Sequence, residues 1–451
     1  MRVRKALSLA AVPMLALGLH ATARGADLLD VYRQAYAADA VYSSARAAWT
    51  AAQEKLPQGL AGLLPTISAT GSTQYNERSV AFRDPRFFSQ NSRDTFNSHN
   101  LTLSLQQPLY RQQNIVAHQQ GRTQVEQADA VLAQASQDLI TRVAQAYVDV
   151  LLARDNVAFA GAQKAAIGEQ LQQAKISFQV GTATITDTHD AQARFDLATS
   201  QEIAAKSDLE VKQRALELLI GKAAPALAPL GPRLQLVLPE PTAQEKWVEE
   251  ARSEANPLVR AAQSNLTLAQ QEVSRNRGAH YPTLDAFAGW NASGSGVGTL
   301  GGSGTDIRGA NIGLQLAVPI YQGGLVNSRV REAHANAEKA RLDLESARRN
   351  AELNARQNYQ GVTSGIAQVK ALEAALVSSK SSLDSTLLGR EVGVRTQVDV
   401  LNAQQQLYSA RRDLAQAKYN YIMSTLKLKA AVGRLSEQDV AAINGWLDPT
   451  Q

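Results

Sequence analysis

The stretch VGTATITD at residues 180–187 returns as VGVRTQVD at residues 392–399, and each copy ends a long run of residues with helical composition. The two glycines that hold the same place in the motif, Gly181 and Gly393, lie 212 positions apart. Solenoid repeats have periods of only about 20–50 residues. The motif therefore predicts one large structural unit that occurs twice in tandem.

A second pair of motifs repeats with almost the same spacing. QQPLY at residues 106–110 returns as AVPIY at residues 317–321, so that Tyr110 and Tyr321 lie 211 positions apart. Because the two spacings differ by one residue, the second copy keeps the order and spacing of the first. Each structural element is therefore expected twice.

Each copy is expected to contain a helix, a β-hairpin, a very long helix, a glycine-containing break and a second helix. The first copy covers residues 24–221, with a helix at 27–59, a hairpin at 65–108, a long helix at 111–179 and a helix at 183–220. The second covers residues 243–433, with a hairpin at 282–319, a long helix at 324–391 and a helix at 395–432. A proline-rich linker at 222–242 reads as an extended strap between the copies, and residues 434–451 form a short tail.

The expected strands alternate between apolar and polar residues. Leu101, Leu103 and Leu105, for example, are separated by threonine and serine. Strands of about 10 residues with one apolar face have the length and period of tilted transmembrane strands. An ordinary soluble hairpin has the same pattern, so the strands alone leave both readings open.

The two long helices are expected to pack in coiled coils. No proline interrupts residues 111–179 or 324–391, and a helix of that length spans about 100 Å. Apolar residues follow each helix in steps of three and four, which is the seam of a coiled coil. The seam residues are Leu139, Val143, Ala146, Val150, Ala153, Val157 and Ala160 in the first copy, and Ala333, Ala337, Ala340, Leu344, Ala347, Ala351, Ala355 and Tyr359 in the second. A helix with so narrow a seam needs neighbouring helices.

The first residues read as a secretory signal. Residues 1–23 contain a basic start, an apolar run at residues 6–19 and a small-x-small site that ends at Ala23, with cleavage after Ala26 as the alternative. Without this segment the formal net charge falls from +5 to +2, so a nucleic-acid surface is not indicated. No later stretch has the roughly 18 consecutive apolar residues of a membrane helix.

Cysteine is absent from the chain. Its absence excludes disulfides, thiolate metal sites, cysteine nucleophiles and an acylated N-terminal cysteine. The sequence also contains no Ser/His/Asp arrangement and no His-Glu-x-x-His motif. We therefore expect neither an enzyme nor a cofactor or metal site.

Four membrane strands per chain cannot close a barrel, and open strand edges are not tolerated in lipid. The chain is therefore expected to oligomerise, so that strands from several copies close one barrel. The same symmetry would gather the long helices into a cylinder with polar inner faces. This arrangement indicates a passage rather than a catalyst.

The chain resembles the TolC family of outer-membrane channel proteins, which serve type I secretion and multidrug efflux. The resemblance covers nearly the whole chain after the signal and rests on the duplicated VG…TxxD segments, PIYQGG at 319–324, QVDVLNAQQQLYSARRDLAQAKYNY at 397–421 and LSEQD at 435–439. It implies a mainly helical fold with membrane β-hairpins, in which a homotrimer forms a twelve-stranded β-barrel in the outer membrane above a periplasmic α-barrel. The implied strand-to-helix junctions are at Pro108, Pro319, Gly323 and Gly324.

The same resemblance implies a function and partners. The channel would export proteins, small toxic compounds or both, together with a periplasmic adaptor protein and an inner-membrane transporter of the ABC or proton-driven kind. The alternative is a structural coiled-coil or adhesin-type protein that spans the periplasm and has no pore activity. Conductance in planar bilayers separates the two.

The glycine turns mark the expected tip of the helical barrel. Gly181 and Gly393 allow the backbone to end one helix before the next begins. A simple interpretation of Thr186, Asp187 and Asp399 is that they cap the new helices. The resemblance instead implies that Thr186 and Asp187 are held by Arg395 in a periplasmic gate, and that Asp399 forms a carboxylate ring in the pore.

Two positions depart from the family pattern at this tip. A second aspartate often follows one helical turn after the first, and here that constriction position is Asn402. A tyrosine that commonly helps to latch the entrance is replaced by Arg390. Arg390 could replace it as a donor to Asp187 or loosen the latch, and the sequence leaves both possibilities open.

Overall fold

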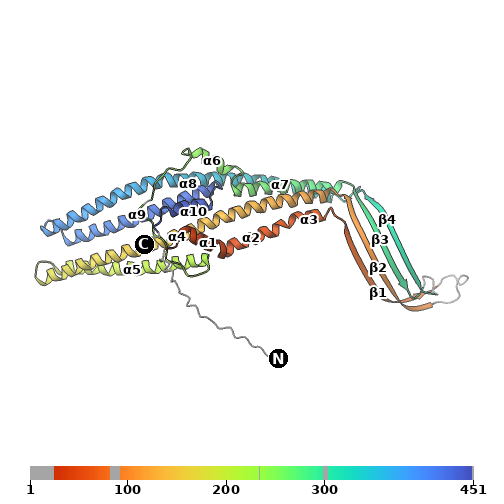
Figure 1. Ribbon diagram of the computed structural model, residues 1–451, viewed down its shortest axis with the longest axis horizontal. Coiled ribbons are helices and arrows are strands. Elements are labelled where there is room, and N and C mark those ends of the chain that lie inside the picture. Colours follow the sequence, from red (N-terminus) through yellow and green to blue (C-terminus); the bar gives the residue numbers. More distant parts are fainter. Residues whose placement is uncertain (1–24, 82–91, 233, 298–302, 449–451) are drawn as a thin grey trace, which may run out of the picture.

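The computed structural model describes residues 25–81, 92–232, 234–297 and 303–448. The expected signal at residues 1–23 lies outside the described residues. The molecule is elongated, with helices along most of its length and a sheet at one end (Figure 1). Among the described residues, the helices include none with the length and apolar composition that a bilayer span requires.

The first repeat begins with three short helices rather than the single helix expected at residues 27–59. Its elements are α1 (Leu28–Ala38), α2 (Ala40–Gln53), α3 (Lys55–Ala61), β1 (Thr66–Val80), β2 (Ser92–Tyr110), α4 (Gln112–Gln179) and α5 (Ile185–Ile220). Asp39 produces the first break, because it ends α1 in an extended conformation and its carboxylate accepts the Tyr42 amide that starts α2.

Asp39 is also held from the long helix. Arg142 of α4 donates to its carboxylate at 2.7 Å. Burial alone would raise the pKa of Asp39, but the hydrogen bonds from Arg142 and the Tyr42 amide outweigh it and keep that pKa below its ordinary value. The break between α1 and α2 is therefore fixed by a buried anion.

The second repeat has the same order of elements. They are α6 (Gln244–Arg252), α7 (Pro257–Arg277), the 3₁₀ turn η1 (Gly278–His280), β3 (Thr283–Ser295), β4 (Thr305–Ala317), α8 (Leu325–Glu391) and α9 (Gln397–Ala431), and the tail adds α10 (Glu437–Asn444). The helices α4 and α8 have 68 and 67 residues, so each is about 100 Å long.

The coiled-coil seams and the widest part of the core coincide near the middle of the molecule. Leu139, Val143 and Val150 of α4 are buried, as are Leu344 and Ala355 of α8. They belong to one buried cluster that also includes residues of α1, α9 and α10. The helices α1 and α10 lie near the middle of the helical body (Figure 1). Away from this belt, toward the tip, α4 packs mainly with α5, and α8 packs mainly with α9 (Figure 1).

The linker runs as a strap across this belt. Leu227 forms a parallel bridge with Ala26, and Leu230 forms an antiparallel bridge with Leu447. Further along the strap, the Val237 amide donates to the Tyr421 hydroxyl of α9 at 2.9 Å. The strap therefore ties both ends of the described chain to the helical body.

The four strands form one antiparallel sheet in the order β1-β2-β3-β4. Their 13 to 19 residues exceed the roughly 10 expected, because polar cross-strand pairs continue the ladder beyond the apolar band. Arg78 and Asp94, 3.2 Å apart, are such a pair. Within the described residues, no further strand lies beside β1 or β4, so both edges of the sheet are open.

Candidate functional site

One face of the sheet is apolar and exposed. Ile67, Leu103, Ile312 and Leu314 lie on this face, and their side chains are 68%, 46%, 87% and 67% exposed. A large exposed apolar face of this kind marks contact with protein or membrane. The opposite face carries small polar residues such as Ser68 and Ser104, whose hydroxyls lie 2.7 Å apart.

A bidentate ion pair fixes the first junction between sheet and helices. Arg111 stands between β2 and α4 and donates from Nε and Nη2 to Asp285 of β3, at 2.8 and 2.6 Å. The ladder shifts register between Pro108 and Tyr110, as expected where proline supplies no amide donor. The chain therefore bends into the helix at the expected position.

Two glycines form the second junction. Gly323 and Gly324 have φ values of 60° and 80°, in the left-handed region that only glycine adopts without strain. Gly324 is the residue that precedes α8. Pro319 lies between the end of β4 and these glycines. PIYQGG is therefore a turn that leads the chain from β4 into α8 (Figure 1).

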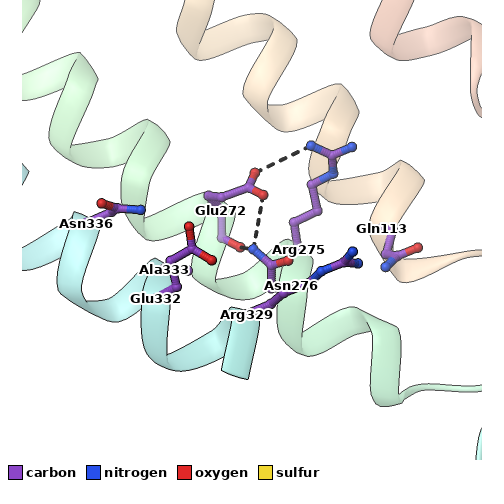
Figure 2. A pocket seen from close by; sticks show the side chains of 8 residues that line it. All are labelled: Gln113, Glu272, Arg275, Asn276, Arg329, Glu332, Ala333 and Asn336. Carbon is purple, nitrogen blue, oxygen red and sulfur yellow. Dashed lines mark hydrogen bonds and ion pairs between the residues drawn. The ribbon is translucent and has the colours of Figure 1, made fainter. Parts of the chain in front are cut away.

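A polar cavity of about 430 Å³ lies on the helices close to the junctions (Figure 2). Gln113 of α4, residues of α7 and residues of α8 line it. Glu272 accepts from Asn276 at 3.0 Å and from Arg275 at 3.5 Å. These contacts neutralise charge on α7, and the cavity brings together no nucleophile and base.

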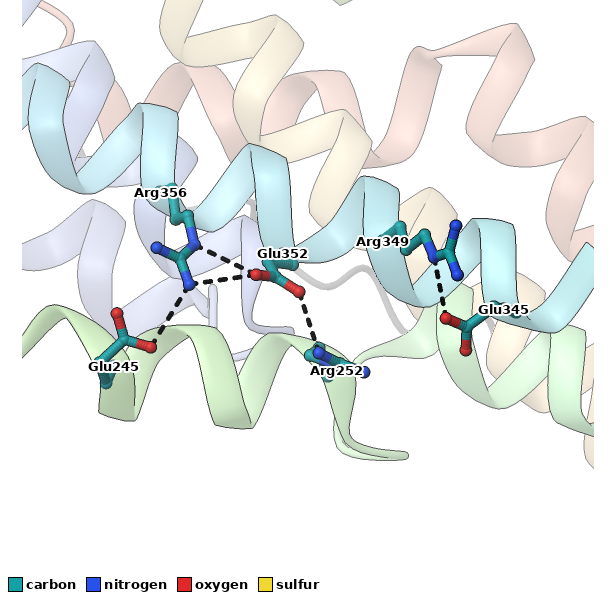
Figure 3. A network of polar contacts seen from close by, with 6 residues as sticks. All are labelled: Glu245, Arg252, Glu345, Arg349, Glu352 and Arg356. Atoms are coloured by element: carbon teal, nitrogen blue, oxygen red, sulfur yellow. Dashed lines mark hydrogen bonds and ion pairs between the residues drawn. The ribbon is translucent and has the colours of Figure 1, made fainter.

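A ladder of ion pairs holds α6 on α8 (Figure 3). Glu352 accepts from Arg252 at 3.0 Å and from Arg356 at 3.1 Å, and Arg356 also reaches Glu245 at 3.5 Å. Partly exposed pairs of this kind contribute only about 0–1 kcal/mol each. We therefore attribute the attachment of α6 mainly to its buried Trp247, and we assign the ladder a structural role.

The tip turns have the backbone that the repeated motif predicts. Gly181 and Gly393 have φ values of 78° and 82°. Each turn is followed by a capping box, in which a threonine hydroxyl accepts the amide of an aspartate three residues later. The threonines are Thr184 and Thr396, so the expectation that Thr186 caps α5 is wrong. The physical reason is spacing, since only Thr184 stands at the N-cap.

Asp187 and Asp399 occupy equivalent places in these boxes. One carboxylate oxygen of Asp399 accepts from both the amide and the hydroxyl of Thr396, each at 2.9 Å. These bonds, with a smaller effect of the Arg395 charge, hold the pKa of Asp399 below its ordinary value. Asp399 is therefore an anion at the tip, and its other carboxylate oxygen accepts neither of these bonds.

Arg390 does not contact Asp187. Its Nη1 donates to Gln170 Oε1 of α4 at 2.7 Å and to Gln397 Oε1 of α9 at 2.8 Å. Gln397 in turn donates to Gln170 at 2.9 Å. Arg390 therefore links the two helical hairpins through neutral amides, and the possibility that it is a donor to Asp187 within one chain is wrong.

Asn402 belongs to a second link between the hairpins. Arg194 of α5 donates to Asn402 Oδ1 at 2.8 Å and to Gln405 Oε1 at 3.2 Å, both on α9. Neither Arg194 nor Gln170 was predicted as a site residue, because each partner lies more than two hundred positions away along the chain. A polar residue in an otherwise apolar seam was the only signal for Gln170.

Arg395 packs back over its own turn. Its Cγ occupies the space that a Cβ on Gly389 would need. In the part of the chain that the structure describes, its side chain bonds to neither Thr186 nor Asp187, whose carboxylate is occupied by Thr184. The expected link from Arg395 to these residues is therefore not formed within one chain.

The comparisons with known proteins agree with this geometry. The model of the family described as "Outer membrane efflux protein" matches residues 26–222 and 247–434. The outer membrane protein TolC of Vibrio cholerae is 35% identical over 434 residues, covering 96% of each chain. The alkaline protease secretion protein AprF of Pseudomonas aeruginosa is 33% identical over 420 residues, covering 92% of this chain and 86% of that protein.

A solved structure shows the same fold. The outer membrane protein VceC from Vibrio cholerae has a TM-score of 0.77 at 18% identity, with 90% of this chain and 96% of that chain covered. The matched family residues include both tip turns and all four strands. The chain belongs to the outer membrane efflux protein family, whose members are channel proteins of the outer membrane.

Proposed function

We propose that this chain is one third of an exit channel that crosses the outer membrane and extends into the periplasm. The observation that carries the proposal is the four-stranded sheet with one exposed apolar face and two open edges. Pairing β4 of one copy with β1 of the next satisfies the edges, as lipid requires. Three copies then give twelve strands, and their long helices form the periplasmic α-barrel.

The proposed cargo is protein, small toxic compounds or both. The name of the Pseudomonas relative refers to secretion of a protease, and the family is described by efflux. The channel would work with a periplasmic adaptor protein and an inner-membrane transporter, either ABC-type or proton-driven. The polar links at the tip support a passage that is narrowed at rest but still conducts, and no chemical reaction is assigned to it.

Conductance in planar lipid bilayers tests this function. The purified protein is expected to insert and to give discrete current steps, because the closed barrel would enclose a water-filled path. A matched control is the protein with Leu314→Asp, which places a charge on the lipid-facing side and should prevent insertion. Wild-type protein that inserts into vesicles yet carries no current would favour the structural alternative.

A further inference from the structure

The polar face of the sheet is free of charge along most of its height. This face comprises the even-numbered residues of β1 and β2 and the odd-numbered residues of β3 and β4, as the pairing register shows. At the positions on this face in 66–76, 96–106, 287–295 and 305–315 there is no aspartate, glutamate, lysine, arginine or histidine. Most are serine, threonine, asparagine, glutamine or glycine.

The amides and hydroxyls on this face bond to one another. Asn291 donates to Asn100 at 2.6 Å and to the Thr102 hydroxyl at 3.1 Å. Asn311 lies over Gly289, where an added Cβ would stand 2.6 Å from its Oδ1. Groups that satisfy one another in this way line the face with dipoles and need no counter-ion.

Charged residues bound this neutral section at both ends, and they are paired. At the helical end Asp285 is held by both donors of Arg111. At the loop end Arg78 and Asp94 lie 3.2 Å apart. Among the described residues of this face, each boundary therefore adds one positive and one negative charge, which cancel.

The sheet does carry other charges, but they lie on its opposite face. Glu77, Arg93 and Asp306 are at the loop end of the apolar face, beyond Leu101, and Arg308 is level with Leu101. In the proposed barrel this is the lipid side, at the height of the head groups. The sheet therefore carries charged residues, but outside the two boundary pairs they lie on the apolar face and not on the polar face.

We propose that the β-barrel is a charge-neutral section of the pore that admits cations, anions and polypeptide segments of either charge. The inference rests on the proposed trimeric channel, in which three copies of this face form the wall. A lining with fixed charges of one sign concentrates the opposite ion, and this wall has no such excess. Selection by charge is then left to the helical part, including the Asp399 tip.

Cysteine labelling tests the wall, because the chain has no cysteine of its own. Ser104→Cys places a thiol on the polar face, and Ala288→Cys places one on the apolar face at nearly the same height. Both replace a small residue. Trimers in vesicles would be treated from the loop side with one of two methanethiosulfonates, which carry a trimethylammonium group or a sulfonate group. The ratio of the two reaction rates would be compared with the ratio for a free small thiol.

Ser104→Cys is expected to react with both reagents, with a rate ratio within about twofold of the free-thiol ratio. Ala288→Cys should stay unreactive in lipid. A bias of about tenfold or more toward one reagent at Ser104→Cys, with Ala288→Cys protected, would overturn the neutral wall. Equal reaction at both positions would instead contradict the proposed membrane channel, so the two failures are distinguishable.

A third variant shows that the assay senses charge. Adding Asn291→Asp to Ser104→Cys places three carboxylates on the wall of the trimer near the reporter thiol. The rate of the cationic reagent relative to that of the anionic reagent should then rise by about tenfold. If this variant left the ratio at the value of Ser104→Cys alone, the thiol would not be sampling the pore wall and the assignment of the face would be wrong.

Discussion

Asp399→Ala is expected to abolish most of the block that multivalent cations cause from the periplasmic side. In the proposed trimer, three Asp399 carboxylates would surround the axis at the narrow tip, where a low-dielectric mouth focuses their field. The hydrogen bonds from Thr396 lower the pKa of this carboxyl group, which favours its ionised form. Single-channel recordings with a trivalent cation would measure the block.

Asp187→Ala is the matched control for this substitution. Asp187 holds the same place in its capping box as Asp399, so its loss removes the same cap on α5 without touching the proposed ring. Block that persists in Asp187→Ala and disappears in Asp399→Ala supports the ring. Unaltered block in Asp399→Ala would mean that this carboxylate only caps its helix.

Asn402→Asp should strengthen the same block. It adds three carboxylates one helical turn from the Asp399 ring. Arg194 already donates to the side chain at this position, so part of the added charge would be neutralised. The gain is therefore expected to be smaller than the loss in Asp399→Ala.

Arg390→Ala is expected to raise the resting current of the closed channel several-fold. Its guanidinium, on α8, donates to Gln170 of α4 in the other hairpin and to Gln397 of α9 in its own hairpin, and bonds to a charged donor contribute about 1.5–3 kcal/mol each. Threefold symmetry would apply the loss three times. The measurement is the current at low voltage before any opening stimulus, with Arg412→Ala on the exposed side of α9 as control.

Arg395→Ser tests a different link. If Arg395 holds Asp187 of a neighbouring copy, its loss should also raise the resting current, although exposed ion pairs contribute only about 0.2–1 kcal/mol each. Equal resting currents in Arg390→Ala and the parent would mean that the hydrogen bonds of Arg390 do not hold the tip closed. Equal resting currents in Arg395→Ser and the parent would contradict the proposed contact between Arg395 and Asp187 of a neighbouring copy.

Much of the fold could be predicted because its breaks are local. Glycines with positive φ and prolines mark the ends of strands and long helices, so the expected ends of α4 and α8 fall within a residue or two of those observed. The strand ends were harder to predict, because polar cross-strand pairs such as Arg78 with Asp94 extend the ladder without any apolar signal.

The remaining differences between expectation and structure have two causes. Some have a local signal that the expected pattern does not use, and others rest on contacts that no local pattern contains. The break before α3 had a local signal in Pro57, which is tolerated in the first turn of a helix and not in its middle. The spacing of the capping box pointed to Thr184 rather than Thr186. The link from Arg390 to Gln170, by contrast, joins residues 220 positions apart, and only the packing of one helical hairpin against the other brings the end of α8 near α4.

The central claim is that one chain supplies one third of a closed pore. The mass of the protein extracted in mild detergent, measured by light scattering with the detergent contribution subtracted, tests it most directly. A single species of three times the chain mass is expected, because the open edges of β1 and β4 must be paired. A monodisperse species with the mass of one chain would contradict the account.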